Sequence, residues 1–306
     1  PPPPPPPPPP PFFFLTQTPA YAILSGLVGS EMCIRDRDQL LLGSEREFLV
    51  KDINTNIGFV GVGNLGRHAI FGLKDSYSIS ASDPIQNEEI KKLGISYQTI
   101  EDLCKNSDVI FLTIKPNKAE EVLNKIIDLI EDKLIISFIA GMSLKKLETL
   151  LSTSNVIRAM PSLGISSGVS PIAVCSAKKI ENNIGETILN KLGKCVEIEE
   201  SKFDAFTSIF GAGPAYISYL GNLLSEIALS NGFEEPEPMI SELLRGTYEI
   251  HNSQSKPSFN QIKTMVASKG GVTEAALKKI ESSGMEEIWK LAIDDAINQS
   301  KNLGDK

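Results

Sequence analysis

The sequence predicts an α/β domain followed by an all-α domain, and three observations support this fold class. Between residues 56 and 198, short apolar runs alternate with segments of helical spacing, which is typical of strand-helix-strand units and a parallel sheet. After Ser201 no convincing strand follows, and apolar residues recur at helical spacing. The chain of 306 residues, 41% of them hydrophobic, is long enough for two domains with buried cores.

Strands and helices alternate along the α/β part of the chain. Strands are predicted at Asn56–Val60, Ser78–Ala81, Val109–Ile114, Leu134–Ile139 and Asn155–Ala159, with two further candidates at Pro171–Cys175 and Cys195–Ile198 that would extend the parallel sheet. Helices are predicted at Leu65–Leu73, Asn87–Leu93, Lys118–Ile130, Leu144–Leu151 and around Ile184–Lys191.

The all-α part begins with an unusually apolar segment. Its spacing predicts one helix from Phe203 to Ile227, with Gly232 as a stop signal. A helix this apolar must be covered on more than one side, and the helical part is too short to surround it, so a second subunit is the expected cover. An ordinary core helix within a monomer is the alternative.

Residues 1–53 are expected to lie outside the fold. Eleven prolines, Pro1 to Pro11, open the chain, and residues 25–37 resemble translated adapter sequence; a genuine proline-rich tail that stays extended is the alternative. The apolar stretch Phe12–Gly29 is interrupted by polar residues and lacks a basic start, so it is a poor signal peptide and a poor membrane span.

The overall composition excludes several classes of function. The net charge of −8 argues against a protein that binds nucleic acid. It also argues against a protein that binds a membrane through a polybasic surface. The four cysteines form no C-x-x-C pair, so we expect no metal site and a reducing, cytoplasmic location. With only two histidines a Ser/His/Asp triad is hard to assemble, and the chemistry is expected to need a cofactor.

The strongest motif is a G-x-G-x-x-G sequence, which runs Gly61-Val62-Gly63-Asn64-Leu65-Gly66 between a predicted strand and a predicted helix. Gly61 permits a tight turn, Gly63 lets the backbone approach a pyrophosphate, and Gly66 allows close packing of the helix on the strand. The motif predicts a Rossmann-type dinucleotide-binding domain over residues 54–200; a purely structural glycine turn is the alternative.

Asp83 lies near the end of the second predicted strand, where an acidic residue commonly holds the adenosine ribose hydroxyls. A carboxylate there would repel a 2′-phosphate, which favours NADH over NADPH. Two alternatives remain: Asp83 caps an Asp-Pro turn, and Ser80 and Ser82 bind a phosphate. The preference between NADH and NADPH therefore stays open.

Four segments resemble one family closely, the pyrroline-5-carboxylate reductases, in the same order and over about residues 56 to 300. They are IGFVGVGNLG (57–66), TIKP (113–116) with ISFIAGMS (136–143), FGAGPAY (210–216) and VASKGGVTEAAL (266–277). The resemblance implies reduction of 1-pyrroline-5-carboxylate to proline with NADPH, which the family commonly accepts, or NADH. It also implies that residues 201–306 form a helical domain that dimerises and binds substrate, giving a homodimer or a higher oligomer built from dimers.

The resemblance also implies roles for individual residues. The nicotinamide would lie between Lys115-Pro116 and Ala140-Gly141, and the rest of the cofactor would contact Gly61, Gly63, Asn64, Leu65, Gly66, Ser82 and Asp83. The substrate carboxylate would bind the backbone N–H groups of Gly270, Gly271, Val272 and Thr273. The Thr273 hydroxyl would serve the ring nitrogen, which makes Thr273 the candidate catalytic residue, and Thr273 would also be the N-cap of the following helix.

Two other classes of function are possible. β-Hydroxy acid dehydrogenases share the outline of the fold but use a lysine on the long interdomain helix, and Asp204–Phe233 contains no lysine. A non-catalytic dinucleotide-binding paralogue is the second; retention of the GAGP sequence and of Gly270, Gly271 and Thr273 argues against it. Lys269 stands where the family commonly has proline, and its role is open.

Overall fold

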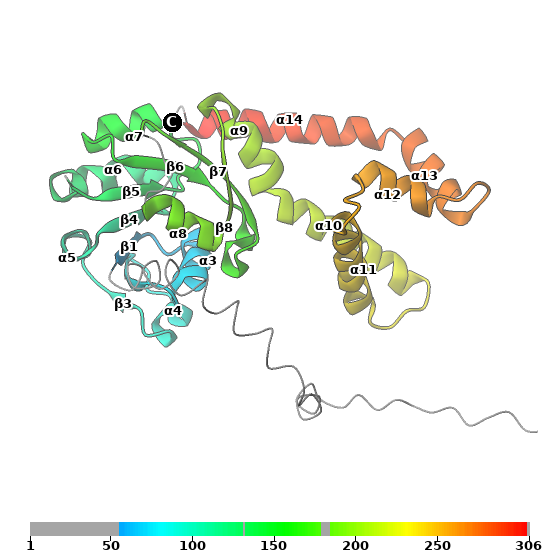
Figure 1. The fold of residues 1–306 in the computed structure, drawn as a ribbon, viewed down its shortest axis with the longest axis horizontal. Helices are drawn as coiled ribbons and strands as arrows, with labels where there is room; N and C mark the ends of the chain where they lie inside the picture. Colours follow the sequence, from blue (N-terminus) through cyan, green and yellow to red (C-terminus); the bar gives the residue numbers. More distant parts are fainter. Residues whose placement is uncertain (1–54, 131, 179–183, 305–306) are drawn as a thin grey trace, which may run out of the picture. The chain divides into compact units, whose positions relative to one another are not determined.

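The structure is a computed structural model, and it describes residues 55–130, 132–178 and 184–304 (Figure 1). The predicted head and lead-in, residues 1–53, lie outside these ranges, so their assignment stays a prediction. The helical part of the described chain begins directly after the last strand.

An eight-stranded sheet forms the core of the α/β part. Its strands are β1 (Asn56–Val60), β2 (Ser78–Ser82), β3 (Ser96–Tyr97), β4 (Val109–Leu112), β5 (Leu134–Ser137), β6 (Val156–Met160), β7 (Ser170–Ser176) and β8 (Gly193–Glu197). They are arranged in the order β3-β2-β1-β4-β5-β6-β7-β8. The first six follow the order of a doubly wound nucleotide-binding sheet, so the Rossmann-type fold is confirmed.

All of the predicted strands are present, but two of them end two residues earlier than predicted. β4 ends at Leu112 instead of Ile114, and β5 ends at Ser137 instead of Ile139. Apolar residues continue past both ends because the loops there still pack against the core, so apolar content alone does not mark where pairing stops. The sequence does not predict β3, which is only two residues long and carries no apolar run.

The direction of β7 differs from the predicted extension of a parallel sheet. β7 pairs with β6 in antiparallel orientation, with Ile157 opposite Ser176 and Met160 opposite Ala173. The connection between these strands is a short 3-10 helix, Leu163–Ser167, whereas a parallel crossover needs a dozen or more residues. β8 then pairs with β7 in parallel, because helix α8 provides the longer connection.

Helices cover both faces of the sheet (Figure 1). α3 (Asn64–Leu73) and α8 (Ile184–Leu192) pack on the face that carries Ile57 and Phe59. α5 (Ile100–Asn106), α6 (Pro116–Ile126) and α7 (Leu144–Leu151) pack on the face that carries Val60. Side chains of one strand alternate between faces, which produces two separate apolar cores.

In the α/β part, helix prediction is accurate for the helices with a long apolar stripe. The observed ends differ from the predicted ends by a few residues at the short α4 (Glu88–Lys92). They also differ at α6, which is followed by a 3-10 turn at Ile127–Leu129. The sequence does not predict α5, because this helix has only seven residues and buries only Leu103 and Cys104.

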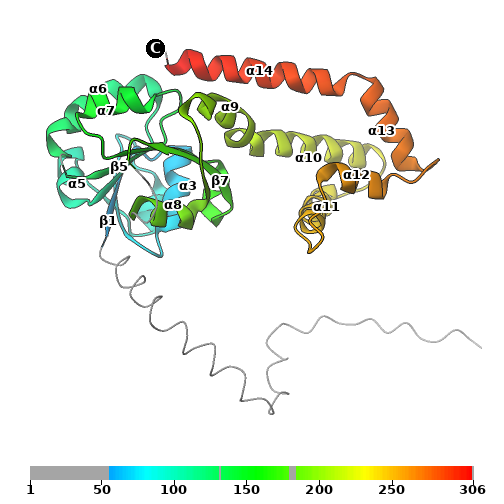
Figure 2. The same ribbon diagram turned by 45° about the horizontal axis from the view of Figure 1, so that its top comes forward.

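The helical part of the chain is drawn most clearly in Figure 2. It consists of α9 (Phe203–Phe206), a π-helical turn (Thr207–Gly211), α10 (Gly213–Ser230), α11 (Pro236–His251), α12 (Phe259–Val266), α13 (Val272–Ser282) and α14 (Met285–Gly304). The prediction of one helix from Phe203 to Ile227 is therefore wrong. The Ala212 N–H donates to the Thr207 carbonyl at 2.9 Å, one residue farther than in an α-helix, and Pro214 has no N–H to continue the ladder.

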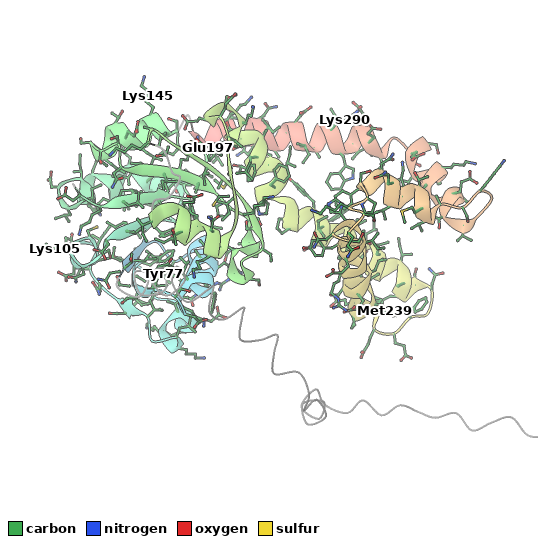
Figure 3. All side chains as sticks on the ribbon, in the orientation of Figure 1. Tyr77, Lys105, Lys145, Glu197, Met239 and Lys290 are labelled. Carbon is green, nitrogen blue, oxygen red and sulfur yellow. The ribbon has the colours of Figure 1, made fainter. Side chains whose placement is uncertain are left out.

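Many apolar side chains of the helical part are exposed to solvent. Examples are Ile217 (53% exposed), Leu243 (54%) and Leu291 (57%), and Met239 of α11, labelled in Figure 3, is 51% exposed. Exposed apolar surface of this extent usually marks an interaction site. None of the helices in the described part of the chain combines the length and apolar character needed to cross a membrane.

A buried ion pair joins β6 to the start of the helical part. The Arg158 guanidinium lies 2.8 Å from the Glu200 carboxylate and 4.3 Å from the centre of the Phe203 ring. Glu200 also accepts the backbone N–H of Leu144, the first residue of α7. The Arg158 side chain is only 5% exposed and that of Glu200 is 37% exposed, so the two members of the pair differ in their access to water.

We expect removal of Glu200 to destabilise the fold more than removal of Arg158. Glu200→Ala leaves a buried guanidinium without its carboxylate, which should cost about 3 kcal/mol or more of unfolding free energy. Arg158→Met leaves a carboxylate that water can reach. Urea unfolding followed by circular dichroism measures both losses. Glu199→Ala, which loses only an exposed pair with Lys202, is the control and should change little. A larger loss for Arg158→Met would contradict the prediction.

Candidate functional site

The residues predicted to bind the cofactor gather at one edge of the sheet. The glycine loop 61–66 follows β1, Ser82 is the last residue of β2, and Asp83 comes directly after it. The loop after β4 carries Lys115-Pro116, and the loop after β5 carries Ala140-Gly141. These four strands are neighbours and parallel, so their carboxyl ends lie together. Ligands of open α/β sheets bind at this edge, where the strand order reverses between β1 and β4.

The glycine loop differs between its two sides in the space that it leaves for a side chain. Gly61 has a φ of 96°, which favours glycine, and a side chain at Gly66 would lie 2.6 Å from both the Gly61 carbonyl and the Thr113 hydroxyl. A side chain at Gly63, in contrast, would meet no atom within 4 Å. The loop is therefore closed by packing on the protein side and open at Gly63.

The first turn of α3 supplies free hydrogen-bond donors beside this opening. The first intrahelical bond is donated by Arg67 to the Gly63 carbonyl at 2.9 Å. The N–H groups of Asn64, Leu65 and Gly66 precede it and have no acceptor within the helix. Backbone donors and the positive end of the helix dipole favour an anion here, so these residues fit a dinucleotide.

The carboxylate of Asp83 holds the glycine loop. Its Oδ2 accepts the Val62 N–H at 2.7 Å, and its Oδ1 accepts the Ile85 N–H at 2.8 Å. The turn-capping role that the sequence leaves open is therefore present. It does not exclude a contact with the ribose, since each carboxylate oxygen accepts more than one hydrogen bond.

The two loops expected to flank the nicotinamide are anchored by helix starts. Lys115 is the N-cap of α6, and Pro116 is the first residue of that helix. Gly141 has a φ of 72°, and Ser143, two residues later, caps α7 by accepting the Lys146 N–H. The end of each loop is thus fixed by the start of the helix that follows it.

The turn at residues 270–273 lies between α12 and α13 in the helical part. Gly270 has a φ of 75°, and the helix starts at Val272 with Gly271 as its N-cap. The prediction that Thr273 is the N-cap is therefore wrong: the extended backbone at Gly271 turns helical one residue before Thr273. Among the residues that the structure describes, no hydrogen bond or ion pair connects this turn to the strand ends.

Two of the four N–H groups expected to bind the substrate carboxylate already have acceptors. The Gly271 N–H donates to the Ser268 carbonyl at 3.0 Å, and the Gly270 N–H donates to Glu274 Oε2 at 2.7 Å. The other carboxylate oxygen of Glu274 lies 3.3 Å from Lys278 Nζ. The N–H groups of Val272 and Thr273 precede the first intrahelical bond and remain available to an anion.

Thr113 and Glu274 have roles that the sequence pattern does not reveal. Thr113 closes the glycine loop through its hydroxyl, and Glu274 places a carboxylate on the substrate turn. The only available signal for Glu274 is an acidic residue in the first turn of a helix, where such residues are common for other reasons.

The three described cysteines are buried or half-buried, and both histidines hydrogen-bond a backbone carbonyl. Burial raises the pKa of Cys104, Cys175 and Cys195 to about 11, so these thiols stay protonated at neutral pH. His68 hydrogen-bonds the Asn64 carbonyl, and His251 hydrogen-bonds the Pro257 carbonyl. Within the described ranges, no group of three His, Cys, Asp or Glu side chains could hold a metal ion.

Two family models match the chain. "Pyrroline-5-carboxylate reductase dimerisation" matches residues 200–303, and "NADP oxidoreductase coenzyme F420-dependent" matches residues 56–141. The curated pyrroline-5-carboxylate reductase of Staphylococcus epidermidis is 28% identical over 266 residues, which cover 81% of this chain and 97% of the relative. That of Aquifex aeolicus is 26% identical and covers 82% of this chain and 98% of the relative.

Solved structures of pyrroline-5-carboxylate reductases are also similar to this chain. The pyrroline carboxylate reductase of Plasmodium falciparum, with NADP bound, has a TM-score of 0.75 at 26% identity and covers 82% of this chain and 98% of its own. The 1-pyrroline-5-carboxylate reductase of Streptococcus pyogenes has a TM-score of 0.73 at 26% identity, covering 81% and 98%.

Alanine at Gly63 and alanine at Gly66 are expected to have opposite effects. Gly63→Ala places a methyl group in the opening of the loop, so it should weaken NADH or NADPH binding while the melting temperature stays unchanged. Gly66→Ala forces the loop backbone to move and should lower stability by about 1–3 kcal/mol. Cofactor titration by fluorescence and thermal unfolding measure the two effects. An unchanged dissociation constant for Gly63→Ala would show that the loop does not bind the cofactor.

Proposed function

The chain belongs to the pyrroline-5-carboxylate reductase family, and from this premise we propose that it reduces 1-pyrroline-5-carboxylate to L-proline with NAD(P)H. The observation that carries the proposal is the presence, in one chain, of an open glycine loop on a Rossmann-type sheet and a glycine turn at a helix start within the region matched by the dimerisation model. The bound cofactor supplies a hydride to the C=N carbon, and a proton completes the two-electron reduction.

The glycine loop and the strand ends bind the cofactor in this proposal. The N–H groups of Asn64, Leu65 and Gly66 bind the pyrophosphate beside Gly61 and Gly63, and Ser82 and Asp83 face the adenosine ribose. Lys115, Pro116, Ala140 and Gly141 border the nicotinamide. The supporting facts are the open space at Gly63, the unspent donors of α3 and the shared sheet edge.

The turn at residues 270–273 binds the substrate carboxylate in this proposal. The free N–H groups of Val272 and Thr273 are its first donors, and the Gly270 N–H becomes available when Glu274 moves fully to Lys278. The Thr273 hydroxyl donates to or accepts from the ring nitrogen. Since the protonated imine is already electrophilic, the protein need only orient it and stabilise that nitrogen, which agrees with the structural roles of the histidines and cysteines.

The protein forms a homo-oligomer, as the family's dimerisation region implies. We propose in addition that the exposed apolar side chains of α10, α11 and α14 form the interface of a dimer, from which higher oligomers are built. The domain limits 54–200 and 201–306 are part of this proposal. The cytoplasmic location expected from the cysteines stays a prediction.

A steady-state assay at the nicotinamide absorbance band tests the function. We expect turnover with 1-pyrroline-5-carboxylate and none with a 3-hydroxy acid. The absence of lysine between Asp204 and Phe233 supports this expectation, because the dehydrogenases of 3-hydroxy acids use a lysine in that region. Turnover of the hydroxy acid alone would overturn the proposal, and cofactor binding without either turnover would indicate a non-catalytic paralogue.

Thr273→Val is expected to lower kcat/KM for the imine by about ten- to a hundredfold, because it removes a hydroxyl used in the transition state and keeps the shape of the side chain. Stability should fall little, since Gly271 rather than Thr273 caps α13. Kinetics and thermal unfolding measure the two quantities. Thr149→Val, which removes an exposed helical hydroxyl on α7, is the control and should leave kcat/KM unchanged. A kcat/KM within about twofold of the wild type would remove Thr273 from the catalytic machinery.

A further inference from the structure

We propose that this chain selects NADH over NADPH, and that Asp83 and Glu89 determine the selection at the carboxyl end of β2. The inference rests on the proposed function only in assuming that the glycine loop binds a nicotinamide dinucleotide. In Rossmann-type sheets the 2′ position of the adenosine ribose lies beside the residue that ends the second strand. The groups around Asp83 therefore decide whether a 2′-phosphate is accepted.

Asp83 presents a negative charge whose position is held. Both of its oxygens accept backbone N–H groups, from Val62 at 2.7 Å and from Ile85 at 2.8 Å. The carboxylate therefore cannot rotate away when a cofactor enters without breaking the bond that holds the glycine loop. A ribose hydroxyl can donate to its remaining lone pairs, whereas a phosphate brings a like charge to the same place.

Arg67, directly after Gly66, is a cation next to the glycine loop that could offset this charge. Its NH1 lies 3.2 Å from the Glu89 carboxylate, and its NH2 donates to Asn64 Oδ1 at 3.4 Å. An arginine is the usual partner of a 2′-phosphate in NADP-binding sheets. Here the guanidinium is already paired, so a phosphate must compete with Glu89 for it.

The short helix α4 offers a phosphate few free backbone donors. Asn87 caps the helix, and its Oδ1 accepts the N–H groups of Glu89 and Ile90 at 2.9 and 3.2 Å. Glu88 and Glu89 occupy the first turn of this helix, and Lys91 and Lys92 lie in its last turn. Lys91 is in addition paired with Glu88 at 3.0 Å.

The experiment measures binding of NADH and of NADPH separately to the full chain without substrate, by the fluorescence of the nicotinamide. We expect NADH to bind at least about tenfold more tightly, and kcat/KM to show the same order. Glu89→Gln releases Arg67 and should improve NADPH binding relative to NADH by about three- to tenfold. Glu88→Gln is the matched control, since it removes a carboxylate from the same turn that pairs with Lys91 instead, and it should leave the ratio unchanged.

Asp83→Asn gives an independent test of the second carboxylate. It removes the charge and keeps one oxygen acceptor, so the preference for NADH should shrink. Because the amide cannot accept both N–H groups, thermal unfolding is measured alongside. Glu89→Gln leaves the glycine loop untouched, so it tests the proposal even if Asp83→Asn destabilises the loop.

Equal binding of the two cofactors by the wild type, or tighter binding of NADPH, overturns the inference. The same result follows if Glu89→Gln and Glu88→Gln change the ratio equally, because the Arg67 pair would then have no special role. These outcomes differ from a failure of the proposed function. A chain that prefers NADH but does not reduce the imine refutes the function alone, and a chain that reduces the imine preferentially with NADPH refutes the inference alone.

Discussion

The close contact between the start of α3 and the ends of β1 and β4 is the constraint on which the site depends. Gly66 lies so near the Gly61 carbonyl and the Thr113 hydroxyl that no side chain fits between them. This contact brings the first turn of α3 directly onto the sheet edge, with its unspent N–H groups at the opening beside Gly63. Asp83 completes the arrangement from β2 by holding Val62. The opening of the glycine loop is therefore formed by backbone packing together with the carboxylate of Asp83.

The helical part depends on a different kind of interaction. Its beginning is tied to the sheet by the Arg158 and Glu200 pair, and the same carboxylate holds the first residue of α7. This places one charged group between the helical part and the loop that leads from Gly141 to α7. Beyond the π-helical turn, the helices expose apolar side chains that a single chain leaves uncovered. A second subunit of the homo-oligomer is the expected cover for these side chains.

Electrostatics distinguish the two anion-binding turns. The glycine loop 61–66 keeps its helix donors free, whereas the turn at 270–273 already holds a carboxylate of its own chain on Gly270. Glu274 is bound on its other side by Lys278, so it has a second partner when a substrate carboxylate arrives. In the proposed function, a substrate carboxylate binds first to the free N–H groups of Val272 and Thr273 and competes with Glu274 only for the Gly270 N–H. At the glycine loop, the first N–H groups of α3 have no such internal competitor, and the carboxylate of Asp83 lies at the expected ribose position.

The sequence by itself determined the alternation of strands and helices, the dinucleotide fold and the family signature, because apolar periodicity and glycine spacing are local properties. It did not determine the direction of β7, the break at residues 207–211 or the N-cap of α13, which depend on connection length and on hydrogen bonds between specific backbone groups. The sequence also did not determine that Asp83 binds the Val62 N–H, that Arg67 pairs with Glu89 or that Glu274 binds the Gly270 N–H. A charged side chain has the same local pattern whether it faces solvent, a backbone donor or an opposite charge, and only the tertiary structure decides which one it meets.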